Sequence, residues 1–267
     1  MYYRLPPKTL VRSNIFQMNT VERFSNRVEN YVRYRPGYPS EVFDLFKTKM
    51  ELSTDSVIAD IGSGPGISAR HFLENGNTVY CVEPNAAMRA AAESLLAAFP
   101  NFKSIDGTSE DTSLSEASVD IVTAAQAFHW FEPKKTRKEF IRILKPGGFI
   151  SLIWNERQLA STPFLREYEA FLIEWANDYE QVRHENIDEQ RLADFFGEAF
   201  EKAEFRNLQR LDLDGLKGRL LSSSYMPSED DARFPELFRN LRILFDKHSE
   251  NGKIEILYDT RIFYQQV

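Results

Sequence analysis

Short apolar runs separated by helical segments fill the first half of the chain. The runs that predict strands cover residues 57–61, 78–82, 102–105, 119–124 and 149–154. Apolar spacing of three or four positions predicts one helix that begins near residue 21 and stops before Pro36, and others at 41–50, 67–74, 86–99 and 134–144. Strands that alternate with helices pack as a parallel sheet with helices on both faces, so the pattern predicts a doubly wound α/β fold.

The pattern is less regular after residue 156. Helical spacing continues over residues 164–187, 215–221 and 234–252, whereas residues 200–214 and 254–267 have the pattern of strands. The two late strands could extend the first sheet, with the helices forming a cap over it, or they could belong to a separate small domain. No linker-like stretch marks a boundary, and this favours the cap.

The expected fold is therefore a Rossmann-like, seven-stranded, mostly parallel sheet with additions at both ends. We expect an N-terminal helical lid in residues 1–50 and the ligand-binding core in residues 51–156. Residues 157–267 then supply the cap helices and the closing strands of the same sheet.

Composition and charge limit the classes of function. Of the 267 residues, 42% are hydrophobic and 27% are charged, which is typical of a soluble protein with a hydrophobic core. The net charge of −7 argues against a protein held on nucleic acid by clustered Lys and Arg. The N-terminus lacks the apolar region of a signal peptide, and no apolar run approaches about 18 residues. With Cys81 as the only cysteine, we expect a cytoplasmic protein with no metal, membrane or nucleic-acid partner; the oligomeric state stays open.

A glycine-rich turn follows the first predicted strand, in the sequence DIGSGPG of residues 60–66. A nicotinamide or flavin site would have the spacing G-x-G-x-x-G, but here the third glycine comes one residue early. The Asp60 carboxylate at the strand end would repel a pyrophosphate and suits a ligand that carries cationic groups. The candidate ligand-binding residues in this turn are Asp60, Gly62, Ser63, Gly64 and Gly66. The alternative is a tight turn with no ligand.

An acidic residue also ends the second predicted strand. Glu83 stands about 20 residues beyond the glycines, where a carboxylate can accept hydrogen bonds from ribose hydroxyls. Taken alone, Glu83 could equally be a solvated residue at the start of a helix. Met88, one turn into that helix, could lie on an adenine ring or in the core.

Together, the D-x-G-x-G-x-G turn and Glu83 make residues 20–155 resemble the class I S-adenosylmethionine-dependent methyltransferases. The resemblance implies S-adenosylmethionine as the cofactor. Within it, the segment GTSEDTSLSEASVDIV resembles the stretch that passes the adenine edge, which implies that Thr108 and Ser109 are adenine-side contacts. Many relatives carry an acidic residue where Thr108 stands.

Two further segments are similar to one branch of that family. The segments AAQAFHWF at 124–131 and YRPGYP at 34–39 resemble trans-aconitate methyltransferases and related small-molecule methyltransferases. This similarity implies that the backbone near Gln126 holds the methionine amino group and that His129 and Trp130 line the site of methyl transfer. It also implies that the N-terminal lid folds over the cofactor, with Tyr31 and Arg35 at the methionine end.

The expected activity is methyl transfer to a small-molecule acceptor, with O-methylation of a carboxylate as one candidate reaction. Methylation of carbon or nitrogen in another metabolite, a non-catalytic S-adenosylmethionine-binding protein and an NAD-dependent oxidoreductase stay open as alternatives. A phenol or amine acceptor would need a base, for which His129 has a suitable pKa range. The acceptor-side candidates are Trp154, Asn155 and Tyr225. Arg157 and Arg219 are conceivable clamps for an anionic acceptor, although ordinary surface arginines are the more common case.

Overall fold

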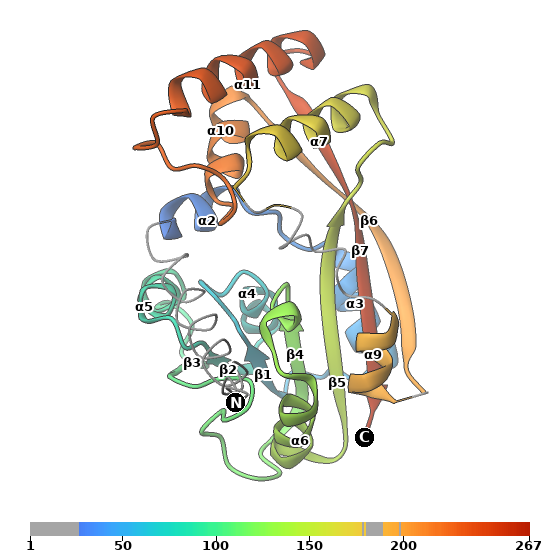
Figure 1. Ribbon diagram of the computed structural model, residues 1–267. Coiled ribbons are helices and arrows are strands. Elements are labelled where there is room, and N and C mark those ends of the chain that lie inside the picture. The colour runs from blue at the N-terminus through green and yellow to red at the C-terminus, as the bar shows by residue number, and fades with distance from the viewer. Residues whose placement is uncertain (1–26, 178, 180–188, 198) are drawn as a thin grey trace, which may run out of the picture.

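The computed structural model describes residues 27–177, 179, 189–197 and 199–267. Its strands are β1 Val57–Ile61, β2 Thr78–Val82, β3 Phe102–Ile105, β4 Val119–Ala125, β5 Leu144–Arg157, β6 Glu201–Leu211 and β7 Ile254–Gln266. They form one seven-stranded sheet in the order β3-β2-β1-β4-β5-β7-β6 (Figure 1). The first five strands pair in parallel, and β7 lies antiparallel between β5 and β6. The predicted mostly parallel sheet of seven strands is confirmed.

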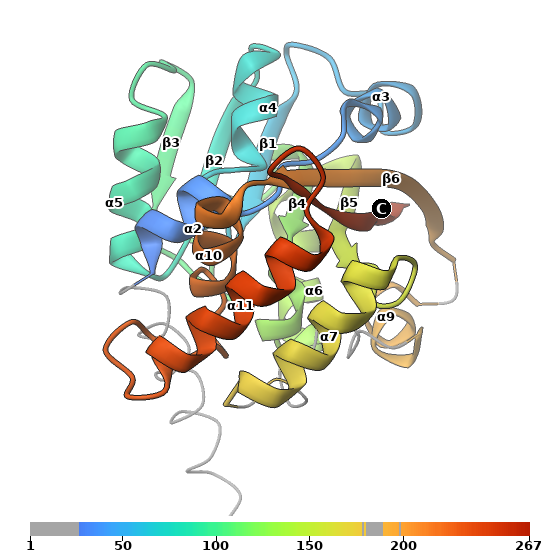
Figure 2. The same cartoon turned by 90° about the horizontal axis from the view of Figure 1, so that it is seen from above.

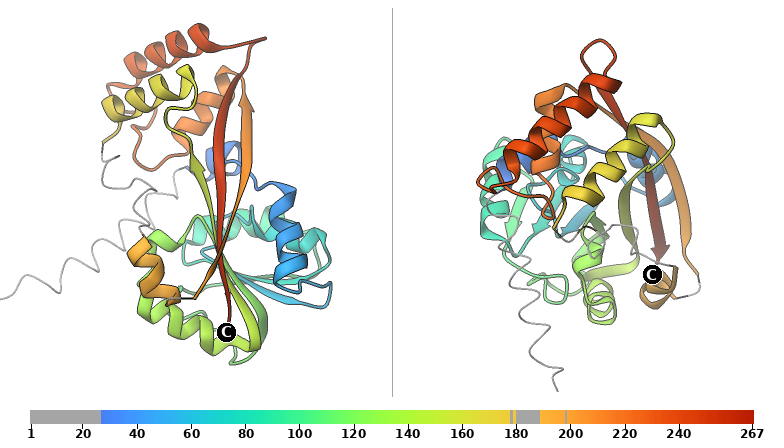
Figure 3. Two further views of the ribbon diagram at one scale, coloured as in Figure 1. Left: turned by 90° about the vertical axis from the view of Figure 1, so that its right-hand side faces the viewer. Right: turned by 45° about the horizontal axis from the view of Figure 1, so that its top comes forward.

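Helices cover both faces of this sheet. The helices of the described residues are α2 Val28–Tyr34, α3 Ser40–Lys49, α4 Ala69–Glu74, α5 Ala86–Leu95, η1 Phe128–Trp130, α6 Pro133–Ile143, α7 Pro163–Trp175, α9 Glu189–Phe196, α10 Leu213–Leu221 and α11 Phe234–His248. Buried residues of α3, α4 and α5 form one hydrophobic cluster with the sheet, and those of α6 and α9 form another on the opposite face (Figure 3). The predicted helical residues 21–26 and 180–187 lie outside the described residues.

Local sequence signals set several of these boundaries. The side chain of Asn85 caps α5 by accepting hydrogen bonds from the backbone N–H groups of Ala87 and Met88. The helix α6 ends at Ile143, one residue before the predicted end and, as predicted, before the sequence KPGG. The following strand begins at Leu144 rather than at residue 149, because it pairs with Val119 across a register shift in β4.

The sequence analysis did not predict α9. Its buried residues Leu192, Phe195 and Phe196 have the spacing i, i+3, i+4 that marks one face of a helix. These side chains pack with α6, so the signal was present in a segment of only two turns.

The helices α7, α10 and α11 form a layer above the core, as seen in Figure 1 and from above in Figure 2. Their apolar residues make a third hydrophobic cluster, which also includes Ile254, Ile256 and Tyr258 of β7. Farther along the same strand, Ile262 and Tyr264 belong to the core cluster of α3 and α4. The long strands therefore carry both the core and this cap layer.

The short helix α2 lies between the core and the cap layer and is attached to α10. The guanidinium of Arg27 donates hydrogen bonds to the carbonyls of Leu221, Ser223 and Met226 at 2.9, 2.6 and 2.6 Å. A cation at these carbonyls, just where α10 ends, is a favourable arrangement. No described helix is long and apolar enough to span a membrane.

Candidate active site

The three glycines of the turn after β1 have different environments. All have positive φ, of 67° at Gly62, 55° at Gly64 and 86° at Gly66, which favours glycine. A Cβ on Gly62 would lie 2.6 Å from the Cβ of Ala127, and one on Gly66 would lie 2.5 Å from Cδ1 of Leu96. A Cβ on Gly64 would meet nothing within 4 Å. Gly62 and Gly66 therefore permit close packing, whereas Gly64 borders open space that a ligand could fill.

Glu83 lies against this open glycine. Its Oε2 accepts a hydrogen bond from the Gly64 N–H at 3.0 Å, and its Oε1 accepts one from the Asn85 N–H at 2.9 Å. Burial raises the pKa of Glu83, and the two backbone donors oppose that effect. Because a carboxylate oxygen can accept more than one hydrogen bond, both oxygens keep capacity for ligand hydroxyls.

Asp60, at the end of β1, is completely buried. Its Oδ2 accepts a hydrogen bond from the Ser68 hydroxyl at 2.6 Å, while its Oδ1 has no hydrogen-bond partner among the described residues. Burial raises the pKa of Asp60 to about 7, and the negative charge of Glu83 adds to the increase. A buried carboxylate oxygen without a donor is costly, so a ligand with cationic N–H groups or a sulfonium fits this position.

Gln126 follows β4 in a left-handed conformation with φ of 57°. Its backbone N–H donates to the Ile153 carbonyl and its Nε2 donates to the Asn155 carbonyl, both at 2.9 Å. Its Oε1 is buried and has no hydrogen-bond partner in the described part of the chain. A non-glycine residue in this conformation costs about 1–3 kcal/mol and is often found at functional sites.

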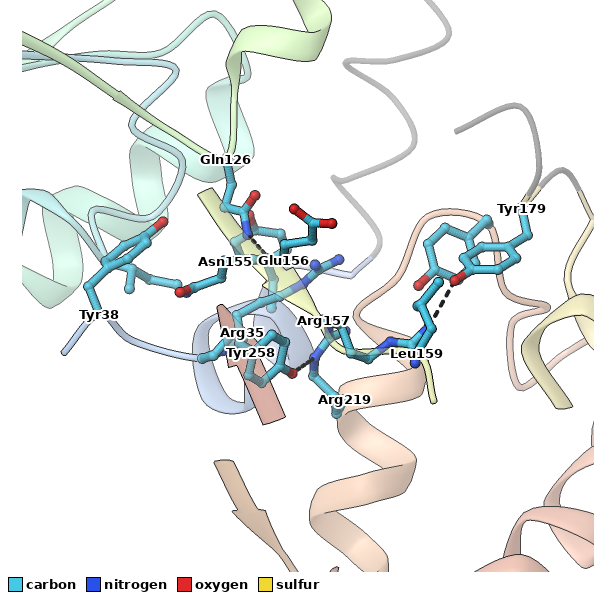
Figure 4. A pocket seen from close by; sticks show the side chains of 14 residues that line it. Arg35, Tyr38, Gln126, Asn155, Glu156, Arg157, Leu159, Tyr179, Arg219 and Tyr258 are labelled. Carbon is cyan, nitrogen blue, oxygen red and sulfur yellow. Dashed lines mark hydrogen bonds between the residues drawn. The ribbon is translucent and has the colours of Figure 1, made fainter. Parts of the chain in front are cut away.

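A cavity lies beyond Gln126, between the carboxyl ends of the strands and the cap layer (Figure 4). It is lined by Tyr31, Arg35, Pro36, Tyr38, Ile67, Gln126, Asn155, Glu156, Arg157, Leu159, Tyr179, Arg219, Tyr225 and Tyr258. In Figure 4, Gln126 and Asn155 approach the cavity from the strands, and Arg219 approaches it from α10. Arginine and tyrosine dominate the lining.

The arginines of this cavity differ in their partners. Arg157 forms an ion pair with Glu169 and donates to the Tyr179 hydroxyl at 2.8 Å. Arg35 donates to the Ser222 carbonyl at 2.9 Å, and its guanidinium lies 4.7 Å from the centroid of the Tyr31 ring. The Arg157 side chain is only 10% exposed and Arg219 is 8% exposed. The prediction that both are ordinary surface arginines is wrong.

Five of the predicted site residues line this cavity: Tyr31, Arg35, Gln126, Asn155 and Tyr225. Trp154 does not line it, because its side chain lies in the hydrophobic cluster on the other face of β5. The Trp154 ring is 4% exposed and packs in the cluster of α6 and α9. The structure thus directs Asn155 toward the cavity and Trp154 away from it.

The two predicted catalytic residues also lie outside this lining. His129 packs between two indole rings, with centroid distances of 4.3 Å to Trp130 and 5.3 Å to Trp154. Trp130 packs against the same cluster as Trp154. A catalytic role for His129 and Trp130 stays a prediction.

The predicted adenine-side residues occupy the chain near the start of α5 and before β4. Met88 is 4% exposed. Thr108 is exposed and its hydroxyl accepts from the backbone N–H of Asp111 at 3.1 Å. Ser109 is buried, and its hydroxyl accepts a hydrogen bond from the Thr136 hydroxyl of α6 at 3.1 Å. The Ser109 hydroxyl is therefore engaged with α6, although its own O–H is not used in that hydrogen bond.

Several lining residues were not among the predicted site residues. Tyr258 follows Ile254 and Ile256 at every second position of β7 and so lies on the same buried face. This spacing indicates burial but does not indicate a cavity. Tyr179 was not predicted either; its ring lies 4.9 Å, between centroids, from that of the predicted residue Tyr225, although the two are far apart in the sequence. No local signal in the sequence predicts such a long-range contact.

Comparisons with known proteins agree with this fold. Residues 59–152 match the family model described as a methyltransferase domain. An uncharacterized methyltransferase of Mycobacterium tuberculosis is 36% identical over 134 residues, which are 50% of this chain and 52% of that protein. The malonyl-[acyl-carrier protein] O-methyltransferase of a Marinomonas species is 25% identical over 142 residues, 51% of each chain. The chain thus spans about half the length of these curated relatives.

A solved structure extends the similarity over most of the fold. A candidate type II methyltransferase from Anaeromyxobacter dehalogenans superposes with a TM-score of 0.62 at 20% identity, covering 87% of this chain and 98% of the other. The chain therefore has the Rossmann-like fold of the S-adenosylmethionine-dependent methyltransferases, and its residues 59–152 match the methyltransferase domain family.

Proposed function

We propose that the chain is an S-adenosylmethionine-dependent methyltransferase that acts on a small-molecule acceptor by O-methylation of a carboxylate. The observation that carries the proposal is the open space over Gly64, which is bordered by Glu83 and followed by a cavity lined with arginine and tyrosine. The match of residues 59–152 to the methyltransferase domain family supports it independently.

The adenosine end of the cofactor would lie over the glycine turn and the start of α5. Glu83 would accept hydrogen bonds from the ribose hydroxyls with the capacity left on its two oxygens. The adenine would lie near Met88, with Thr108 and the backbone of Ser109 on its other side. Gly64 leaves the space that this ligand needs.

The methionine end would lie between Asp60, Gln126 and the helix α2. Asp60 and the orphaned Oε1 of Gln126 are acceptors suited to the ammonium group. Arg35 would pair with the carboxylate of the cofactor, since its Nε is buried and has no hydrogen-bond partner among the described residues. Tyr31 supports the Arg35 guanidinium through its ring face.

When bound, S-adenosylmethionine supplies a methyl group on a sulfonium, and transfer to a carboxylate oxygen gives a methyl ester and S-adenosylhomocysteine. The protein's own contribution is alignment of the two reactants and exclusion of water by α2 and the cap layer. A carboxylate is already ionised near neutral pH, so this reaction needs no general base. His129 would act as a base only toward a phenol or an amine.

The choice of an anionic acceptor follows from the charge of the cavity. Its lining contains Arg35, Arg157 and Arg219 but only one carboxylate, that of Glu156, which pairs with Arg261 at 2.5 Å. The relative from Marinomonas is named a malonyl-[acyl-carrier protein] O-methyltransferase. The similarity of the segments AAQAFHWF and YRPGYP to trans-aconitate methyltransferases points to the same class of acceptor.

Calorimetric titration with S-adenosylmethionine and with NAD, followed by transfer of a labelled methyl group to a panel of carboxylates, tests the proposal. Methyl esters of the same acids are the matched controls, since their carboxylates are blocked. Cofactor binding together with labelled ester supports the proposal. Cofactor binding without turnover on carboxylates, phenols and amines contradicts the enzymatic part and leaves a binding protein. Binding of NAD without affinity for S-adenosylmethionine contradicts the whole proposed function.

A further inference from the structure

Arg219 is a buried cation that no carboxylate of the described residues neutralises. Its Nε approaches the Tyr258 hydroxyl at 3.4 Å, and its Nη1 approaches the hydroxyls of Ser222 and Ser223 at 3.4 and 3.1 Å. All three partners are neutral hydroxyl groups, and two of the distances are long for a hydrogen bond. A guanidinium that is 8% exposed and lacks an anion is unfavourable, because burial removes its hydration.

The neighbouring charges increase the need for an anion at this point. Burial is the main cause that lowers the pKa of Arg35. The positive charge of Arg219 lowers it further, because the two guanidinium groups repel each other. Arg157 is neutralised by Glu169, although its Nη1 is also buried and without a hydrogen-bond partner in the described chain. Arg35 and Arg219 therefore lack counter-ions among the described residues. The proposed function assigns the carboxylate of the cofactor to Arg35, and Arg219 then still lacks a counter-ion.

The surroundings of Arg219 suit a small oxyanion on a planar or slender molecule. Tyr225 and Tyr258 line the cavity beside it, and both are at least nine-tenths buried. The Tyr258 hydroxyl donates to Oε1 of Gln209 at 3.3 Å. Aromatic walls restrict the width of a bound molecule, while the guanidinium offers two parallel N–H donors to a carboxylate or phosphate.

Resting on the proposed function, we infer that Arg219 binds an oxyanion of the acceptor that is distinct from the atom receiving the methyl group. A carboxylate paired with a guanidinium shares its charge and is a weaker nucleophile, and a fixed cation beside the reaction centre would repel the sulfonium. The acceptor therefore carries an anchoring anion in addition to its reacting group. For a carboxylate acceptor this means a dianion that leaves as a monoester.

The test uses the full chain loaded with S-adenosylhomocysteine. The probes are malonate, glutarate and phthalate, with their dimethyl esters as neutral controls and phenyl phosphate as the alternative oxyanion. Thermal unfolding and calorimetry are measured for the wild type, Arg219→Met and Arg219→Lys. Lys217→Met is the matched control, because Lys217 is on the same helix but pairs with Glu229 at 2.7 Å.

We expect at least one dianion to raise the unfolding temperature of the wild type and of the Lys217→Met variant, while its dimethyl ester does not. Arg219→Met should bind that anion at least tenfold more weakly, should bind S-adenosylhomocysteine normally and, without anions, should unfold at a higher temperature than the wild type. Arg219→Lys keeps the charge, so it should fold and show an intermediate response.

In turnover, Arg219→Met should raise KM for the dianion at least tenfold and change kcat little, as expected for an anchor away from the reacting atom. Equal stabilisation of the wild type and Arg219→Met, or no response of the wild type to any probe anion, overturns the inference. These results leave the proposed function intact as long as S-adenosylhomocysteine binds. Loss of that binding in the wild type contradicts the proposed function instead.

Discussion

The carboxylate of Glu83 accepts a hydrogen bond of 3.0 Å from the backbone N–H of Gly64. This contact ties the end of β2 to the glycine turn after β1, two elements that are adjacent in the sheet. Glu83 therefore holds the turn in place and also borders the open space that the proposed cofactor would fill. Changes at either residue should affect ligand binding by different routes.

Removal of the Glu83 side chain should weaken the binding of S-adenosylmethionine. Glu83→Ala loses the carboxylate that orders the turn and accepts the ribose hydroxyls, and we expect a loss of roughly 1–3 kcal/mol. Glu83→Gln keeps an acceptor for Gly64 and should lose less. Calorimetry measures both, with Glu93→Gln on the outer part of α5 as a control. Unchanged affinity in Glu83→Ala would contradict the assignment.

A side chain at Gly64 should block the ligand rather than the fold. Gly64→Val places carbon atoms in the space above the turn and should abolish cofactor binding. Gly252 is a matched control, because it also has a positive φ, of 72°, and a Cβ there also meets nothing within 4 Å. Gly64→Ala and Gly252→Ala should each lower stability by about 1–2 kcal/mol through backbone strain. Only the change at Gly64 should weaken binding; similar affinities in the two variants would count against a cofactor at this turn.

The affinity for S-adenosylmethionine should increase as the pH rises through about 7. Burial raises the pKa of Asp60 to about 7 in the free protein, and a cationic ligand favours the ionised carboxylate. Below this pH the ligand must displace a proton, so its affinity should fall by up to about tenfold per pH unit. Titrations on both sides of neutrality measure the slope, and Asp60→Asn should flatten it. Glu83, whose pKa is also raised, should retain a weaker dependence in that variant.

The stability of the free protein should change with pH in the opposite sense. Because the folded-state pKa of Asp60 is raised above its unfolded value, its contribution to stability is largest below the unfolded pKa and declines as the pH rises toward 7. Thermal unfolding of the wild type and Asp60→Asn without ligand separates this effect from binding. If both proteins lose stability equally as the pH rises from the unfolded-state pKa of Asp60 to about 7, Asp60 does not have the raised pKa.

The contact between α2 and α10 should not tolerate a methyl group at Gly218. A Cβ there would lie 2.1 Å from the Tyr34 ring. Alanine would add up to about 1 kcal/mol of helix propensity, but overpacking costs about 1–3 kcal/mol. We therefore expect Gly218→Ala to lower the unfolding temperature and weaken cofactor binding. Gly37→Ala, which meets nothing within 4 Å, should do neither; equal behaviour of the two variants would show that the helix contact is dispensable.

The sequence was most informative where the determining interactions are local. The strands at 57–61 and 78–82 were predicted with the bounds that the structure has, because a short apolar run lies next to a turn in each case. The open position at Gly64 also follows from local spacing. Burial of Arg157 and Arg219 could not be predicted, because it depends on Glu169, Tyr258 and other partners that only the folded chain brings close.

The orientation of Trp154 and Asn155 shows a second limit of sequence reasoning. Both residues lie near the end of β5, and proximity in sequence suggested that both open toward the cleft. Trp154 and Asn155 face opposite sides of β5, and which of them faces the cavity depends on the register with β4 and β7. That register includes an irregularity between Val119 and Ile121, which the apolar pattern does not reveal.

The strands β5, β6 and β7 run without a break from the hydrophobic core of the sheet into the cap layer. This continuity restricts how the cavity can open. A swinging lobe needs a joint of a few residues whose backbone torsions are free to change. β6 pairs with β7 in continuous register from Glu201 opposite Tyr264 to Leu211 opposite Ile254, and β5 pairs with β7 as far as Arg157 opposite Tyr258, so the strands themselves provide no such joint. We therefore expect the upper helices to move together with the sheet. We expect small molecules to gain access by displacement of α2, which is attached to the end of α10 through the hydrogen bonds of the Arg27 side chain.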